Sequence, residues 1–102
     1  MTKGNALALA LLISSAPELA ALAADGKSVY DRVCYKCHRS GVDGAPKTGN
    51  KEDWTPRVAK GKEELLKSVI EGKGEMPPRA KKPELTDDEL KAAVEYLLEK
   101  AQ

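Results

Sequence analysis

The sequence predicts an all-α fold of four to five short helices, arranged in one small domain of the 102-residue chain. Apolar residues recur at the three- and four-residue spacing of amphipathic helices, most clearly near the C-terminus. The stretches between these segments are rich in Gly and Pro, which favour loops over helices or central strands. Both observations indicate short helices joined by irregular loops.

The composition limits the functions that the chain can have. Lys and Arg number 17 and Asp and Glu number 16, so the net charge is +1. This balance excludes a polyelectrolyte role and gives no support for a nucleic-acid partner. The chain has no Phe, and aromatic residues make up only 4% of it. A domain this small, with so little aromatic surface, needs an additional stabilising element in its core, such as a bound cofactor, a metal or disulfides.

Residues 1–23 have the pattern of a Sec signal peptide. Lys3 precedes an apolar stretch over residues 6–13, and residues 21–23 form a small-x-small cleavage site. The apolar stretch is too short to span a bilayer, and Glu18 blocks its extension. We therefore expect a domain over residues 24–102 that is exported to the periplasm without stable membrane insertion. The alternative is an uncleaved membrane anchor.

The first helix is expected over residues 26–38, with Asp25 as its N-cap. One face of this helix carries Gly26, Val29, Tyr30, Val33 and Cys37. A glycine near the start of a helix is costly by propensity. Gly26 is explained either by a close crossing with another helix or by fraying beside the cap.

Both cysteines and the only histidine lie within five consecutive positions at the end of this helix, as Cys34, Cys37 and His38. C-x-x-C-H is typical of a c-type haem attachment site. Side chains at i, i+3 and i+4 project from one helix face. Two sulfurs can then form thioethers with the vinyl groups of one haem, and the imidazole can ligate its iron. One covalently attached haem c would also supply the additional apolar mass that stabilises the core.

Three alternatives compete with this interpretation of the motif. A disulfide between Cys34 and Cys37 would close a very small loop and leave His38 unexplained. A zinc site would lack a fourth ligand of the usual type, because the sequence has no other Cys or His. A thioredoxin-like redox pair needs a strand before the motif, and we predict none there.

Residues 39–50 form a loop by composition. Asn50 is expected to cap a short helical turn through Trp54, and Pro56 to begin a second turn through Ala59. Trp54 either fills the core or packs on the haem edge with its indole N–H bonded to a polar partner, and the two roles are compatible.

A third helix is expected over residues 62–71, opened by Gly61 and stopped by Gly72 at the C′ position. Its two acids at positions 63 and 64 suit the positive start of a helix. The side chains expected to be buried are Leu65, Leu66, Val69 and Ile70.

Met76 follows this helix in a loop that Pro77 and Pro78 stiffen. It is the only methionine of residues 24–102. A thioether in such a loop can ligate the iron on the face opposite His38, which raises the reduction potential and keeps both oxidation states six-coordinate. The alternative is an open or water-bound iron.

The last helix has the clearest local signal. Thr86 caps it and forms a capping box with Glu89, while Leu85 and Leu90 form a hydrophobic staple. Tyr96 lies beside its apolar stripe. The stripe consists of Leu90, Ala93, Val94, Leu97, Leu98 and Ala101.

Together these segments resemble a class I c-type cytochrome with one haem, closest to the small bacterial cytochrome c-five branch. The resemblance covers nearly the whole of residues 24–102, through segments 33–38, 41–47, 54–57, 75–78 and 92–97. Gly26 and Tyr30 keep the distances to Cys34 that the family's first-helix glycine and aromatic residue keep. Tyr96 matches the aromatic residue of the family's last helix. One departure is that residues 79–85 contain no cysteine, whereas many members of this branch carry a pair there.

The resemblance implies a cytochrome c fold whose first and last helices cross at Gly26. It also implies that the Pro46 carbonyl accepts the hydrogen of His38 Nδ1, which fixes the ring. Trp54 and Arg57 are implied to lie near a haem propionate.

These features favour a soluble, exported, monomeric one-electron carrier that shuttles between larger respiratory or photosynthetic redox complexes.

A positive rim is expected around the exposed haem edge, while the acids gather mostly on the last helix. The basic residues of this rim are Lys36, Arg39, Arg79, Lys81 and Lys82. The alternative is an ordinary solvated surface. The competing function is a haem enzyme or gas sensor with an open iron site, such as a peroxidase, for which the chain offers no second histidine.

Overall fold

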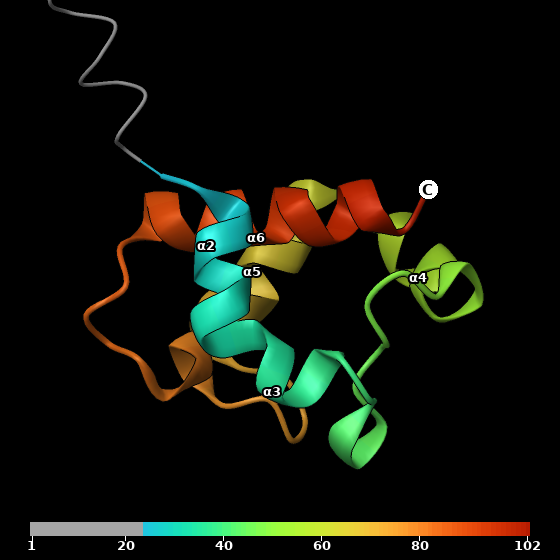
Figure 1. Cartoon of the computed structure of the whole chain (residues 1–102), viewed down its shortest axis with the longest axis horizontal. Coiled ribbons are helices and arrows are strands. Elements are labelled where there is room, and N and C mark those ends of the chain that lie inside the picture. The colour runs from blue at the N-terminus through green and yellow to red at the C-terminus, as the bar shows by residue number, and fades with distance from the viewer. Residues whose placement is uncertain (1–23) are drawn as a thin grey trace, which may run out of the picture.

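The computed structural model describes residues 24–102, and the predicted all-α class is confirmed over this range (Figure 1). The predicted signal peptide lies outside the described residues. Within them the helices are all too short or too polar to cross a membrane. The elements in order are α2 (Gly26–Val29), η2 (Tyr30–Cys34), α3 (Tyr35–His38), η3 (Val42–Gly44), α4 (Lys51–Val58), α5 (Lys62–Glu71), η4 (Pro78–Lys81) and α6 (Asp87–Lys100).

The first helix runs from α2 through α3 as predicted, but its middle part, η2, is a π-helical turn. The N–H of Tyr35 donates to the carbonyl of Tyr30, five residues earlier. This wider turn rotates the residues after it relative to those before it. Val29 and Cys37, which the sequence places on one face, differ in burial, because Val29 is buried and Cys37 is exposed. The side chain of Asp25 also makes no capping hydrogen bond.

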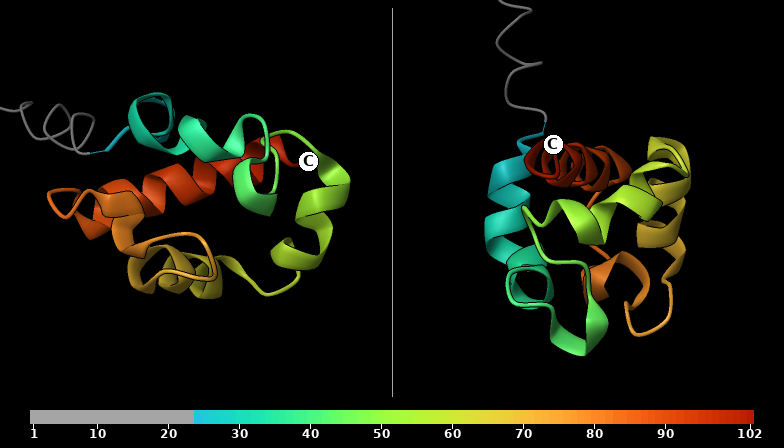
Figure 2. Two further views of the ribbon diagram at one scale, coloured as in Figure 1. Left: turned by 90° about the horizontal axis from the view of Figure 1, so that it is seen from below. Right: turned by 90° about the vertical axis from the view of Figure 1, so that its right-hand side faces the viewer.

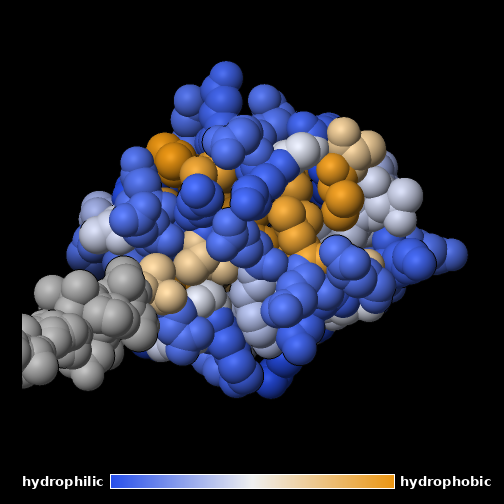
Figure 3. Space-filling model, turned by 90° about the horizontal axis from the view of Figure 1, so that it is seen from above, coloured by the Kyte–Doolittle hydropathy of each residue, from blue (hydrophilic) through white to orange (hydrophobic). Residues whose placement is uncertain are grey.

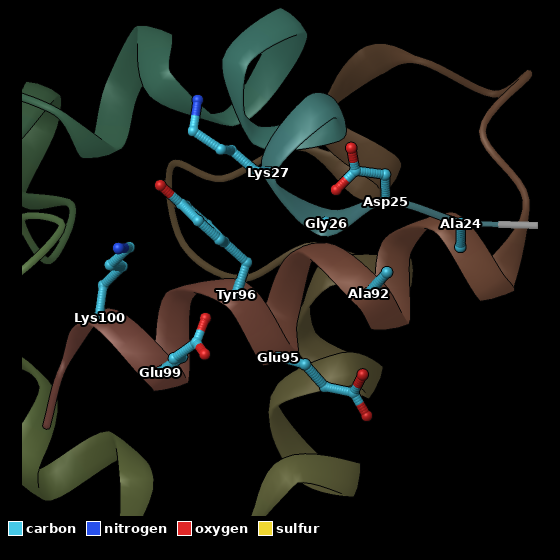
Figure 4. Close-up of a pocket in the computed structure, with 9 residues that line it drawn as sticks. All are labelled: Ala24, Asp25, Gly26, Lys27, Ala92, Glu95, Tyr96, Glu99 and Lys100. Carbon is cyan, nitrogen blue, oxygen red and sulfur yellow. The ribbon is translucent and has the colours of Figure 1, made fainter. Parts of the chain in front are cut away.

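The first helix crosses α6 closely at Gly26 (Figure 1). A Cβ atom at this position would lie 2.1 Å from the carbonyl oxygen of Ala92. Beside the crossing, the rings of Tyr30 and Tyr96 pack with centroids 5.2 Å apart. Figure 4 shows the open groove on the outer side of this crossing, where charged side chains of both helices surround Gly26. The expected crossing at Gly26 is therefore confirmed, and fraying does not explain this glycine.

Helix α6 begins with the predicted capping box. Thr86 Oγ1 accepts a hydrogen bond from the N–H of Glu89, and the Glu89 carboxylate accepts one from the N–H of Thr86. Leu85 and Leu90, the staple residues, are both buried in one core cluster with Val29. Each such buried Leu stabilises the fold by about 1.5–3 kcal/mol through burial alone, and α6 contributes more buried residues than any other described element.

Helix α4 is one continuous helix, whereas we expected two separate turns divided at Pro56. Its start agrees with the prediction, because Asn50 Oδ1 accepts the N–H of Asp53 at 3.0 Å. Pro56 removes only its own N–H from the hydrogen-bond ladder. The ladder resumes beyond it, where the N–H of Ala59 donates to the carbonyl of Thr55 at 3.3 Å.

Helix α5 has the predicted bounds, with Gly61 and Gly72 at its ends in positive-φ conformations. The prediction that its apolar side chains are buried is wrong, since all four are only half-buried. Three of them, Leu66, Val69 and Ile70, pack against one side of the core cluster. Although α5 also contacts α4 and η4, none of its residues is fully buried by protein atoms.

The outer surface is mostly hydrophilic. Figure 3 shows apolar side chains gathered in two places on the face seen there, between polar ones. In both views of Figure 2, the segment after α5 that carries Met76 lies apart from the motif helix α3, on the opposite side of the molecule, and the left view shows α6 running across the fold. The motif and the methionine loop therefore approach the interior from opposite sides.

We predict that Gly26→Ala destabilises the protein by about 1–3 kcal/mol, because the added methyl group overlaps the backbone oxygen of Ala92, which cannot rotate away. This loss exceeds the helix-propensity gain of at most about 1 kcal/mol. Ser28→Ala, at an exposed position of the same helix, is the control. Urea unfolding of the haem-loaded proteins measures the difference, and equal midpoints for the two variants would contradict the close crossing.

Candidate functional site

The three motif residues lie together at the end of the first helix but differ in exposure. Cys34 is half-buried, Cys37 is exposed and His38 is buried, with 8% of its surface accessible. Neither cysteine forms a disulfide in the described part of the chain. Burial raises the pKa of the Cys34 side chain to about 11 while it is an unreacted thiol. The Cys37 sulfur is the more exposed of the two.

The loop after the motif fixes the orientation of the His38 ring. Nδ1 lies 2.8 Å from the Pro46 carbonyl oxygen, the contact that the resemblance implied. A carbonyl can only accept a hydrogen bond, so Nδ1 carries the proton and Nε2 keeps its lone pair. The N–H of Thr48 donates to the His38 carbonyl at 2.7 Å, which holds the backbone of the same residue. This is the tautomer that a metal-ligating imidazole needs at Nε2.

Thr48 also links this loop to the first helix. Its hydroxyl lies 2.7 Å from the Tyr30 hydroxyl and 3.2 Å from the His38 carbonyl oxygen. The Tyr30 ring in turn packs on Tyr96 of α6. Polar contacts thus connect the histidine loop to the crossing of the first and last helices.

Trp54 closes the next side of the site. It is buried, its Nε1–H donates to the Lys47 carbonyl at 2.8 Å, and its ring centroid lies 5.9 Å from that of His38. The indole therefore fills the core and also has the polar partner that we expected. Arg57, one turn further along α4, directs its guanidinium to the Asp53 carbonyl at 2.6 Å.

Met76 ends a tight turn. Its N–H donates to the Lys73 carbonyl and its carbonyl accepts the Lys73 N–H, each at 2.9 Å. A Cβ atom on Gly72, which has φ +88°, would lie 2.9 Å from Pro78 and 3.0 Å from the Met76 carbonyl oxygen. Glycine is thus required for the loop to fold back on the end of α5. The half-buried Met76 is therefore held at its backbone by two neighbouring segments.

The segment after the prolines has an unusual backbone. Arg79, Ala80 and Lys81 take positive φ angles of 52°, 54° and 64° in succession. Each such residue costs on the order of 1 kcal/mol when it is not glycine. This left-handed turn must be stabilised by contacts elsewhere.

The positive rim is smaller than expected. Arg79 forms an ion pair with Asp87 at 2.9 Å and donates a hydrogen bond to the Leu85 carbonyl. Its charge is therefore neutralised by the start of α6. Lys36 and Lys81 are exposed, and the Arg39 guanidinium lies 5.8 Å from the centroid of the neighbouring Tyr35 ring.

Sequence reasoning missed three contributors to the site. They are the Lys47 carbonyl, the Thr48 hydroxyl and the Arg79 guanidinium. The first two lie in the Gly/Pro loop, where no local pattern shows which groups meet a ring formed by residues far along the chain. The Arg79 contacts depend on the left-handed turn, which non-glycine residues do not predict.

The site suits the cofactor that the motif predicts. Two thiols within one helical turn and an imidazole with Nε2 available provide the donor set of a c-type haem site. The apolar side of α5 that protein atoms leave half covered, formed by Leu65 and its neighbours, suits a flat apolar macrocycle. The residues present therefore fit the group.

Comparison with known proteins agrees with this chemistry. Residues 21–97 match the family model described as "Cytochrome C oxidase, cbb3-type, subunit III". The chain is 41% identical to cytochrome c-555 of Chlorobaculum tepidum over 91% of its own length and 90% of that protein. It is 39% identical to cytochrome c5 of Azotobacter vinelandii over 71% and 89% of the two chains.

A solved structure gives the same result. The cytochrome c in the crystal structure of an electron transfer complex with nitrite reductase is 43% identical to this chain and superposes with a TM-score of 0.73. The match covers 76% of this chain and 94% of that one.

Proposed function

Because the chain belongs to the cytochrome c family and carries one covalently attached c-type haem, we propose that Cys34 and Cys37 form its two thioethers. In this proposal His38 Nε2 and the Met76 sulfur ligate the iron from opposite faces. One observation carries the assignment: His38 Nδ1–H donates its hydrogen bond to the Pro46 carbonyl, which leaves Nε2 as the available ligand atom at the end of the C-x-x-C-H turn.

When bound, the haem supplies a one-electron Fe(III)/Fe(II) couple. The chain holds the donors on both sides of the site. The loop with Pro46 and Thr48 fixes the histidine ring and its backbone, and the turn at Lys73 fixes the methionine backbone. Donors that stay in place in both oxidation states leave little to reorganise, which favours electron transfer over substrate binding at the iron.

Trp54 and Arg57 complete the proposed site on the α4 side. The buried indole packs beside the His38 ring. The Arg57 guanidinium is anchored to a backbone carbonyl of its own helix, which keeps a positive charge at this edge. We propose that both lie near a haem propionate.

The chain is an electron-transfer protein, as its relatives are, which favours a carrier over a haem enzyme or gas sensor with an open iron site. We propose that residues 1–23 direct its export and are removed, and that residues 24–102 act as a monomeric carrier in the periplasm. Its partners would be larger redox complexes. The relative solved in complex with nitrite reductase supports a reductase as one class of partner.

Intact mass spectrometry of the protein matured in its own host tests the attachment and the cleavage together. We predict the mass of residues 24–102 plus one haem, because both thiols are free to form thioethers. Cys37→Ser should leave a single thioether and a haem that is lost more readily on denaturation. A mass equal to that of the polypeptide alone would contradict the proposal.

Met76→Ala tests the second ligand. We expect the reduction potential to fall by on the order of 0.1 V, within the range over which axial ligands tune haem iron. The ferrous variant should bind carbon monoxide, and the weak sulfur-to-iron absorption band at the red end of the spectrum should disappear. Met76→His, which restores a ligand, should abolish carbon monoxide binding. A Met76→Ala spectrum identical to that of the wild type would exclude Met76 as the ligand.

The remaining basic side chains predict an ionic-strength effect. The oxidation rate with hexacyanoferrate(III), an anion, should fall as salt is added, and the rate with a cationic cobalt complex should rise. Lys36→Glu and Lys81→Glu should each slow the anionic reaction about two- to tenfold at low salt. Lys91→Glu, an exposed change on α6, is the control. If the anionic rate does not respond to salt, the surface near the haem edge is electrostatically neutral.

A further inference from the structure

The connection from Met76 to α6 is strained but ordered. Its left-handed turn at Arg79, Ala80 and Lys81 is opposed by the backbone preference of each residue. Inside the turn, the N–H of Ala80 donates to the Pro77 carbonyl at 3.1 Å and the N–H of Lys82 to the Arg79 carbonyl at 2.9 Å. These local bonds shape the turn, but they do not tie it to the rest of the fold.

Ala80 packs against the core cluster and Pro78 lies close to Gly72. The Arg79 side chain adds the polar contacts that tie the turn to the start of α6. One guanidinium nitrogen lies 2.9 Å from Asp87 Oδ1 and another donates to the Leu85 carbonyl. The side chain is only 25% exposed, while that of Asp87 is 69% exposed. A planar guanidinium can satisfy two acceptors at once in a fixed geometry, which lysine cannot do.

Both acceptors, the Leu85 carbonyl and the Asp87 carboxylate, lie at the capped start of α6. Leu85 is buried in the core cluster beside Leu90 and directly precedes the Thr86 capping box. Asp87 is the first residue of α6, where the positive end of the helix favours its negative charge. The guanidinium therefore connects a turn three residues after Met76 to the capped start of α6, the helix with the most buried residues.

We propose that Arg79 is the positioning residue for Met76: its two contacts hold the methionine loop closed, and so keep the thioether in place against the iron. This inference rests on the proposed ligation by Met76. It assigns to Arg79 a structural task at the haem site in place of the docking role expected from its charge.

Imidazole competition in the ferric, haem-loaded protein measures this closure. Imidazole binds only after the sulfur has left the iron, so its binding rate levels off at high concentration at the rate of loop opening. We call this plateau of the imidazole-binding rate the limit. We expect the limit to rise about tenfold in Arg79→Gln, because this variant loses a charged hydrogen bond and an ion pair. Arg79→Lys should fall between Arg79→Gln and the wild type.

The chain offers two matched controls. Arg32 also pairs with an acid of α6, Glu89, at 3.9 Å, but its side chain is 56% exposed and it lies outside the methionine loop. Arg32→Gln removes the same charge and should change the limit less than about twofold. Asp87→Asn should raise the limit, whereas Asp88→Asn, at the next position of the same helix turn, should not. If Arg79→Gln fails to fold, comparison of Asp87→Asn with Asp88→Asn still tests whether the Arg79–Asp87 contact holds the methionine loop closed.

The outcomes separate two claims, that Met76 ligates the iron and that Arg79 positions Met76. Equal limits for Arg79→Gln and Arg32→Gln, together with equal limits for the two Asp variants, would overturn the role of Arg79 while leaving Met76 as the ligand. If the wild type and Met76→Ala bind imidazole at the same rate without levelling off, no sulfur is displaced, and both the ligation and the role of Arg79 fall. Urea midpoints measured in parallel separate opening of the loop from global unfolding. If the imidazole rate limit of Arg79→Gln rises by no more than its loss of global stability accounts for, the inference is overturned.

Discussion

The close crossing of the first helix over α6 is the contact on which the rest of the molecule depends. Only a residue without a side chain fits at Gly26, because the Ala92 carbonyl occupies the space of a Cβ atom. That approach brings Tyr30 onto Tyr96, and Tyr30 then reaches Thr48 with its hydroxyl. Through this chain of contacts, the position of a helix pair determines where the histidine loop lies.

Outside this crossing, polar contacts to the backbone replace the large apolar core that the composition cannot provide. The buried residues form two small clusters, one around Leu90 and one around Trp54. The loops between them are held by carbonyl groups that accept from side chains, as Pro46 does from His38 and Lys47 from Trp54. Because such bonds are directional, they orient rings more narrowly than apolar packing does. The family's covalent haem adds the apolar mass that these loops lack.

Much of the fold could be predicted from the sequence because its helix ends are encoded locally. Asn50, Gly72 and the Thr86–Glu89 box each mark a boundary through their own backbone contacts. The π-helical turn before the motif and the half-covered face of α5 could not be predicted, since both depend on what packs against the helix. The motif gave the donor residues of the candidate site, but the groups that orient them belong to segments with no recognisable pattern.

The docking role expected of Arg79 from its charge and the positioning role proposed for it exclude each other. A guanidinium that is paired with Asp87 and largely covered cannot present a free charge to a partner. The positive surface expected at the haem edge therefore depends on Lys36 and Arg39 beside the motif, and on the exposed Lys81 and half-buried Lys82 after the methionine loop. This division has a physical advantage, since a partner that binds these side chains leaves the Arg79 contacts intact. Docking and ligand retention can then vary independently, so a change in partner charge need not loosen the methionine loop.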